Sequence, residues 1–178
     1  MKLHEDNTLG VLGSAIGKGL LAGIAATAVM TLSQMIEMKI TKRQASDAPV
    51  KVAEDTAGAK PATPQDKTRL SQELHWSYGT VWGVARGLIG LTGLKGLPAS
   101  LFHFGAVWGT ALIMLPKHNA AKPINEQEPK DIAIDVLHHG VYAVTAGLVY
   151  DAIDAGSKNQ RKLNKIAGML KSLVKRYK

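Results

Sequence analysis

The sequence predicts an all-α membrane protein: a polytopic bundle of about four transmembrane helices, followed by a basic amphipathic C-terminal helix. Residues 19–36, 96–116 and 136–150 carry no Lys, Arg, Asp or Glu. The formal charge of +8, from 22 Lys and Arg against 14 Asp and Glu, lies outside these stretches. Cysteine is absent, so disulfides and thiolate metal sites are excluded.

The predicted spans form one transmembrane domain over residues 1–155. Each is close to the length that crosses ~30 Å of hydrocarbon at ~1.5 Å per residue. We expect the first to be retained rather than cleaved, because Glu5 and Asp6 occupy the region that is basic in a signal peptide. A long buried helix of a soluble bundle is the alternative, but such a helix shows a charged face, which is missing here. The spans cover residues 10–36, 76–94, 97–116 and 132–155.

Polar segments connect the spans. The loop 37–73 contains a short predicted helix near 47–57, with Pro49 in its first turn and Gly58 past its end. The stretch KPATPQDKT that follows is predicted to be a linker. A tight turn at Lys95 and Gly96 makes the second and third spans an antiparallel hairpin.

The tail, residues 156–178, is rich in Lys and Arg and has no acid, and its apolar residues recur at helical spacing. This pattern is typical of a helix lying on an anionic membrane surface. A terminal helix docked on protein is the alternative. The cations expected to contact lipid headgroups are Lys162, Lys165, Lys171, Lys175 and Arg176.

Orientation does not follow from charge, because four spans place equal numbers of Lys and Arg on the two sides. The basic tail favours cytoplasmic termini. Nucleic acid is not an expected partner, because the cations are not interleaved with aromatic residues on a folded face.

Glycine and alanine recur at four-residue spacing in every predicted span. In lipid, helix association depends on close backbone approach, which such small residues allow. The pattern predicts a tight bundle, self-association or packing on a membrane partner protein. The expected packing glycines are Gly19, Gly23, Gly79, Gly83, Gly87, Gly105, Gly109 and Gly147.

Ionisable residues lie inside the predicted spans, where a charge costs ~2.5 kcal/mol or more. Arg86 could hold an anionic substrate or a cofactor propionate, or it could pair structurally with an acid such as Asp151. Asp135 and His139 lie one helical turn apart and could pair. The full set of intramembrane candidates is Arg86, His103, Asp135, His138, His139, Asp151 and His75.

No catalytic motif is present: the chain has no nucleophile elbow, HExxH or Walker loop. The sequence therefore predicts a non-enzymatic membrane protein without a cofactor or a metal, acting as a homo-oligomer or an accessory subunit. The alternative is a small transporter, a channel or a haem-carrying protein that uses the intramembrane Arg and His.

The layout resembles that of the YagU-type inner-membrane proteins of bacteria. The segments that carry the resemblance are LLAGIAATAVM in the first span, PKHNAAKPINEQEPKDIAIDVLHHGVY before and within the last, and the basic tail. The resemblance implies the bacterial cytoplasmic (inner) membrane and self-association. No functional site transfers with it.

Overall fold

The computed structural model describes residues 2–176, and within them the side chains outside 2–7, 161, 171 and 173–176. Every element in this part of the chain is helical. The elements are α1 (Lys2–Thr41), α2 (Ala48–Ala57), α3 (Pro64–Leu91), α4 (Gly96–Lys117), the short 3-10 helix η1 (Ile124–Glu126) and α5 (Pro129–Arg176).

Three of these helices are long and apolar enough to cross a membrane. They lie within Thr8–Thr41, Gly96–Lys117 and Pro129–Leu170, which points to a membrane-integral protein. Helix α3 is not among these three, because its first turns are polar and its second half contains Arg86.

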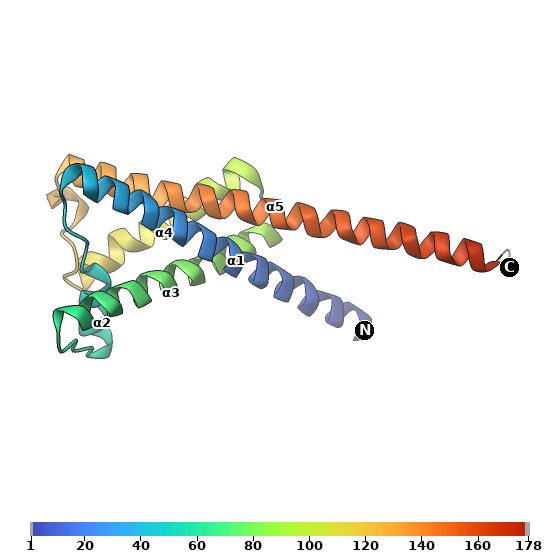
Figure 1. Ribbon diagram of the computed structural model, residues 1–178, viewed down its shortest axis with the longest axis horizontal. Helices are drawn as coiled ribbons and strands as arrows, with labels where there is room; N and C mark the ends of the chain where they lie inside the picture. Colours follow the sequence, from blue (N-terminus) through green and yellow to red (C-terminus); the bar gives the residue numbers. More distant parts are fainter. Residues whose placement is uncertain (1, 177–178) are drawn as a thin grey trace.

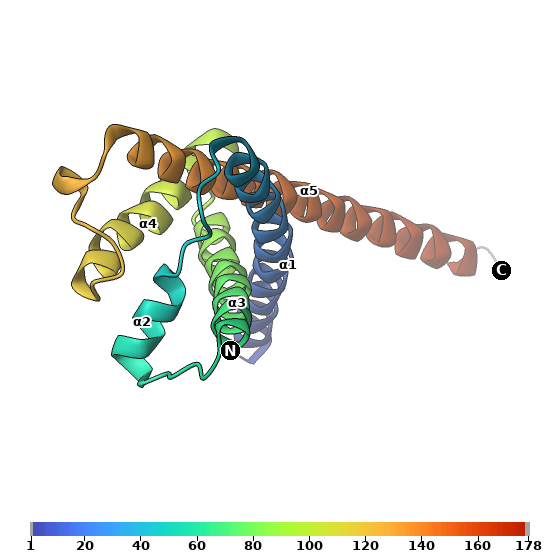
Figure 2. The ribbon, with the colours of Figure 1, turned by 60° about the vertical axis from the view of Figure 1, so that its left-hand side comes forward.

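The helices form a bundle in which α1 packs on α3 and α5, and α4 packs on α5 (Figures 1 and 2). The loops 42–47 and 118–128 lie at one end, here called the loop end. The short α3–α4 connection lies at the other, here called the turn end. Beyond the turn end, the first turns of α1 and the last turns of α5 extend away from the bundle (Figure 1).

The centre of the bundle is filled mainly by small side chains. Ala26 of α1, Val107 of α4, and Tyr142 and Ala146 of α5 form the buried cluster, and partly buried Trp82 packs against it. Small residues allow the helix axes to approach closely, which is the packing mode that lipid favours.

The closest helix contact in this bundle is the crossing of α1 over α3. A Cβ added at Gly23 would lie 2.6 Å from the carbonyl oxygen of Thr80 and 3.0 Å from Cα of Gly83. A Cβ on Gly83 would collide with the backbone of Gly19 and Gly23. Only glycine fits at these positions, because the two backbones are in contact there.

Helix α2 packs against α3 outside the membrane-crossing segments. As predicted, Pro49 lies in its first turn and Gly58 ends it, in the left-handed conformation with φ 64°. Asp47 is at the N-cap position and forms no side-chain capping hydrogen bond. Lys67 of α3 donates to Asp47 at 3.0 Å. This hydrogen bond holds the pKa of the Asp47 carboxyl below its usual 3.8.

Two helices differ from the sequence expectation. α3 begins at Pro64, inside the predicted linker, because the Thr63 hydroxyl accepts the backbone N–H of Asp66 and caps the helix. α5 continues without a break from Pro129 to Arg176, so the predicted last span and the predicted tail are one helix. Gly156 lies within this helix and does not interrupt it, since a single glycine is tolerated in a helix.

Replacing Gly83 by Leu is expected to destabilise the folded chain by about 1–3 kcal/mol or more, since the new side chain must push α1 away from α3. The unfolding free energy in detergent micelles, titrated with a denaturing detergent, measures this. Gly140→Leu is the matched control, because a Cβ at Gly140 meets nothing within 4 Å. Equal stability of the two variants would contradict the crossing described above.

Candidate functional site: buried polar groups between the helices

At the turn end, the fully buried guanidinium of Arg86 reaches from α3 to α5. Its Nη2 donates to Oδ1 of Asp151 at 2.6 Å. The other carboxylate oxygen of Asp151 accepts the backbone N–H of Gly96 at 2.9 Å, at the N-terminus of α4. The ring of Tyr150 lies under the guanidinium, 4.6 Å from Cζ to the ring centroid. One carboxylate thus ties α3, α4 and α5 together.

This pairing fits the structural role that the sequence offered for Arg86. A buried guanidinium is tolerated when it is paired and further contacts offset the cost of its desolvation. The negative charge of Asp151 is stabilised by the positive end of the α4 helix dipole. Two guanidinium nitrogens, Nε and Nη1, form no hydrogen bond within the described residues. A Cβ on Gly147 would lie 3.8 Å from Arg86 Nε and would collide with the hydroxyl of Ser100. Glycine at 147 therefore makes room for these polar groups.

His103 of α4 is fully buried between α3 and α5. Its Nε2 donates to the carbonyl oxygen of Trp82 at 3.0 Å, and its ring lies 5.7 Å from that of Tyr142, centroid to centroid. Tyr142 in turn donates to the carbonyl of Gly79 at 2.5 Å. Since Nε2 is engaged, haem ligation through this nitrogen would first require loss of the Trp82 hydrogen bond.

A second polar group lies at the loop end, around Glu37 of α1. Arg43 donates to its carboxylate through Nη2 at 2.7 Å and Nε at 3.2 Å, and the Thr41 hydroxyl donates at 2.7 Å. His138 of α5 approaches the same carboxylate to 3.6 Å through Nε2, while its Nδ1 lies 3.1 Å from the Ser33 hydroxyl. Glu37 and His138 together join the ends of α1 and α5.

Asp135 and His139 form the predicted pair one turn apart on α5, at 3.1 Å. Asp135 also accepts the indole N–H of Trp108 from α4 at 2.7 Å. His75 of α3 lies 3.0 Å from the hydroxyl of Thr31 on α1. Trp108 and Asp135 link α4 to α5, His75 and Thr31 link α3 to α1, and the Asp135–His139 pair lies within α5. Within the described residues, no cluster of three or more His, Asp or Glu side chains could hold a metal ion.

The polar groups at the two ends do not meet. Asp135 and Asp151 are sixteen positions apart on α5, about 24 Å along the helix. The buried cluster of Ala26, Val107, Tyr142 and Ala146 lies between them. Apart from His103, which packs on Tyr142 in this cluster, the candidate residues form two separate interhelical groups. Arg86 and Asp151 form the turn-end clamp, and the loop-end clamp contains His75, Asp135, His138 and His139.

The predicted packing glycines fall into two classes. In the first class, a Cβ would collide with a neighbouring helix; these are Gly19, Gly23, Gly79, Gly83, Gly87 and Gly147. A Cβ on Gly105 or Gly109 of α4 meets nothing within 4 Å. Among the predicted surface cations, Lys162 and Lys165 are exposed, whereas the side chains of Lys171, Lys175 and Arg176 lie outside the described residues.

Sequence reasoning missed several members of the clamps. Lys18 of α1 donates to Asp154 of α5 at 3.0 Å, and Lys158 pairs with the same carboxylate. The four-residue spacing of Asp154 and Lys158 was a usable signal. No local sequence pattern indicates the hydrogen bond from Trp108 to Asp135 or the contact of His138 with Glu37, because each joins residues of different helices.

In comparisons with known proteins, no family model matches the chain, and no curated protein or solved structure is significantly similar to it.

Replacing Asp151 by Asn is expected to cost about 3–5 kcal/mol of unfolding free energy, because it leaves Arg86 buried without a counter-charge. Adding Arg86→Met to this variant should recover part of the loss, since the unpaired charge is then gone. Asp131→Asn serves as the control, an exposed acid in the first turn of the same helix. If Asp151→Asn unfolds no more readily than Asp131→Asn, the turn-end clamp does not stabilise the bundle.

Proposed function

We propose that this chain is a four-span integral membrane protein that acts without catalysis, by associating with a second copy of itself. The fourth span is the second half of α3. It packs on α1, α4 and α5, and its exposed side carries the apolar residues Val81, Leu88 and Leu91. Its one formal charge after Glu73 is the buried and paired Arg86, which faces the neighbouring helices. A span whose ionisable groups face other helices rather than lipid tolerates a lower overall apolarity. The resemblance to YagU-type proteins supports the bacterial inner membrane as the location.

The observation that carries the association is the outer face of α4. Gly105 and Gly109 lie open there, next to Leu101, Phe102 and Ile113, which are 60%, 63% and 74% exposed. The other glycines predicted to mediate packing already contact neighbouring helices of the same chain, whereas Gly105 and Gly109 are open. In lipid, a glycine groove allows a second helix to approach to backbone contact.

A second copy suits this face better than an unrelated partner. The helix offers a groove at its glycines and protruding side chains beside it, so two copies related by a twofold axis can each fill the other's groove. Residues 96–116 carry no formal charge, so two copies do not repel each other. An accessory role on a different membrane protein would use the same face.

The tail half of α5 is part of the same proposal. Leu163, Ile166 and Met169 are exposed along it, and Lys162 and Lys165 flank them. A bend at Gly156, against which nothing packs, would lay this half on the membrane surface. There its apolar side would enter the headgroup region and its cations would contact anionic lipid.

A second candidate function, a small transporter or channel, is favoured by one specific observation. Arg86 and His103 are fully buried, and each has ring or guanidinium nitrogens without a hydrogen bond among the described residues. Buried groups of this kind in other proteins bind ordered water or a polar ligand. Under this hypothesis His103→Ala abolishes a flux while leaving assembly intact.

The double variant Gly105→Leu/Gly109→Leu is expected to convert the associated protein to monomer while leaving each bundle folded, since both positions face away from the rest of the chain. Its oligomeric mass, measured by light scattering on the detergent-extracted protein, tests this. Gly140→Leu is the control, an open glycine on α5, and should remain associated. A wild-type monomer in every mild detergent and in vesicles, or an associated double variant, would refute self-association through α4.

A further inference from the structure

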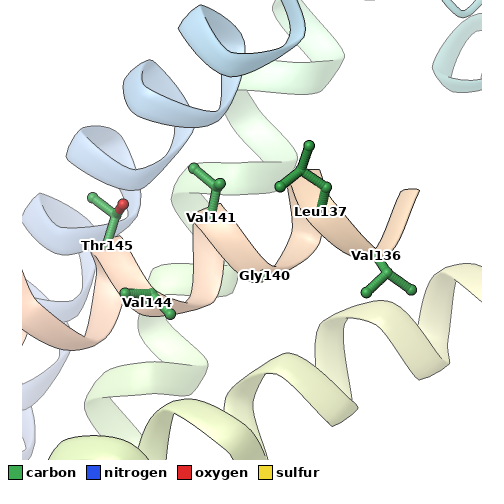
Figure 3. A pocket seen from close by; sticks show the side chains of 6 residues that line it. All are labelled: Val136, Leu137, Gly140, Val141, Val144 and Thr145. Carbon is green, nitrogen blue, oxygen red and sulfur yellow. The ribbon is translucent and has the colours of Figure 1, made fainter. Parts of the chain in front are cut away.

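An open groove runs along the outer side of the bundle at the seam of α1 and α5. Near the loop end it has a volume of about 430 Å³ and is bounded by α1 and by Leu137 of α5. Its α1 wall is formed by Val29, Leu32, Ser33, Ile36, Glu37, Ile40 and Thr41. A second hollow on α5 continues it past Leu137. Figure 3 shows that Leu137, Val141 and Thr145 of this hollow point to the side of α1.

The dimensions of the groove match one leaflet of a bilayer. From Val29 to Thr41 the α1 wall extends twelve residues, about 18 Å along the helix axis. Half of a hydrocarbon core of ~30 Å is ~15 Å. Five of the eight lining residues are large and aliphatic, and of these Leu32 and Ile36 are 56% and 54% exposed. A groove of this length and lining fits an acyl chain.

The groove ends beside a basic rim. α1 ends at Thr41, and Lys39, Lys42 and Arg43 lie at or just past its last turn. Lys39 and Lys42 are exposed and form no ion pair with the described residues. The one acid in the groove, Glu37, is already neutralised by Arg43, with Nη2 at 2.7 Å from its carboxylate. The rim therefore keeps a positive charge that an anionic headgroup can neutralise.

We infer that this groove is a binding site for an anionic phospholipid of the leaflet at the loop end, with an acyl chain along α1 and the phosphate on the Lys39 and Lys42 rim. The inference rests on the membrane insertion proposed above, but not on self-association through α4. It differs from the lipid contact of the tail, which lies at the opposite end of the bundle.

The test uses the full chain in mild detergent with equimolar phosphatidylglycerol and phosphatidylcholine that carry the same acyl chains. Native mass spectrometry counts the lipids retained on each protein. Phosphatidylglycerol is expected to exceed phosphatidylcholine by about tenfold, in keeping with two lysines near one phosphate. Equal retention of the two lipids would overturn the headgroup assignment.

Three variants locate the site. Ile36→Trp fills the groove from an exposed position and should lose the retained lipid of both kinds, whereas Val81→Trp on the exposed side of α3 should keep it. Lys39→Gln/Lys42→Gln should keep one lipid but lose the preference for phosphatidylglycerol. If Ile36→Trp retains phosphatidylglycerol as wild type does, the lipid is bound elsewhere. Recovery of the chain without detergent would instead refute membrane insertion itself.

Discussion

The backbone contact between α1 and α3 is the constraint on which the rest of the bundle depends. In lipid there is little hydrophobic drive between helices, so the fold must gain its packing energy from van der Waals contact at short distance. Gly19 and Gly23 against Gly79 and Gly83 provide that contact. It also fixes the rotation of α3, because turning its glycine face to α1 directs Trp82 and Arg86 toward α4 and α5.

At the two ends of the bundle, interhelical polar contacts hold the helices together. Arg86 and Asp151 join three helices at the turn end, and Glu37 with Arg43 and His138 closes the loop end. Buried ion pairs add little net stability over an apolar core, but breaking one is costly, so they specify which helices face each other. Between the clamps, small side chains such as Ala26 and Ala146 leave the centre closely packed. This arrangement gives a helix bundle that is closely packed inside and has large apolar side chains on its outer faces.

Much of this was readable from the sequence, and the exceptions have physical reasons. The bounds of α4 are predicted by the positions of Lys95 and Lys117, which flank an uncharged stretch. The Asp135–His139 pair followed from helical spacing, and Arg86 with Asp151 was one of two roles considered for that arginine. The start of α3 does not follow from composition, because Pro61 and Pro64 are typical of a linker, whereas in the structure Thr63 and Asp66 form a capping pair.

The contacts between helices are the part of the structure that the sequence predicts least. Periodicity places a residue on a face of its own helix but does not say which helix that face meets. For this reason the division of the glycines into packed ones, such as Gly83, and open ones, such as Gly105, required the structure. The same holds for the groove at Leu137, which exists only where α5 lies along α1. The continuity of α5 through residue 156 was hidden because the change from apolar to basic composition resembled a boundary.

The most direct test of the central claim, that α3 is a fourth span, is the membrane sidedness of its two ends. The chain has no cysteine, so Lys60→Cys and Lys95→Cys each introduce a single reactive thiol, before and after α3. The two variants are labelled in sealed vesicles with a membrane-impermeant maleimide, before and after permeabilisation. A four-span bundle places the two thiols on opposite sides, so the fractions accessible from outside are complementary whatever the orientation. Equal accessibility of both positions from the same side would show that α3 does not cross the membrane.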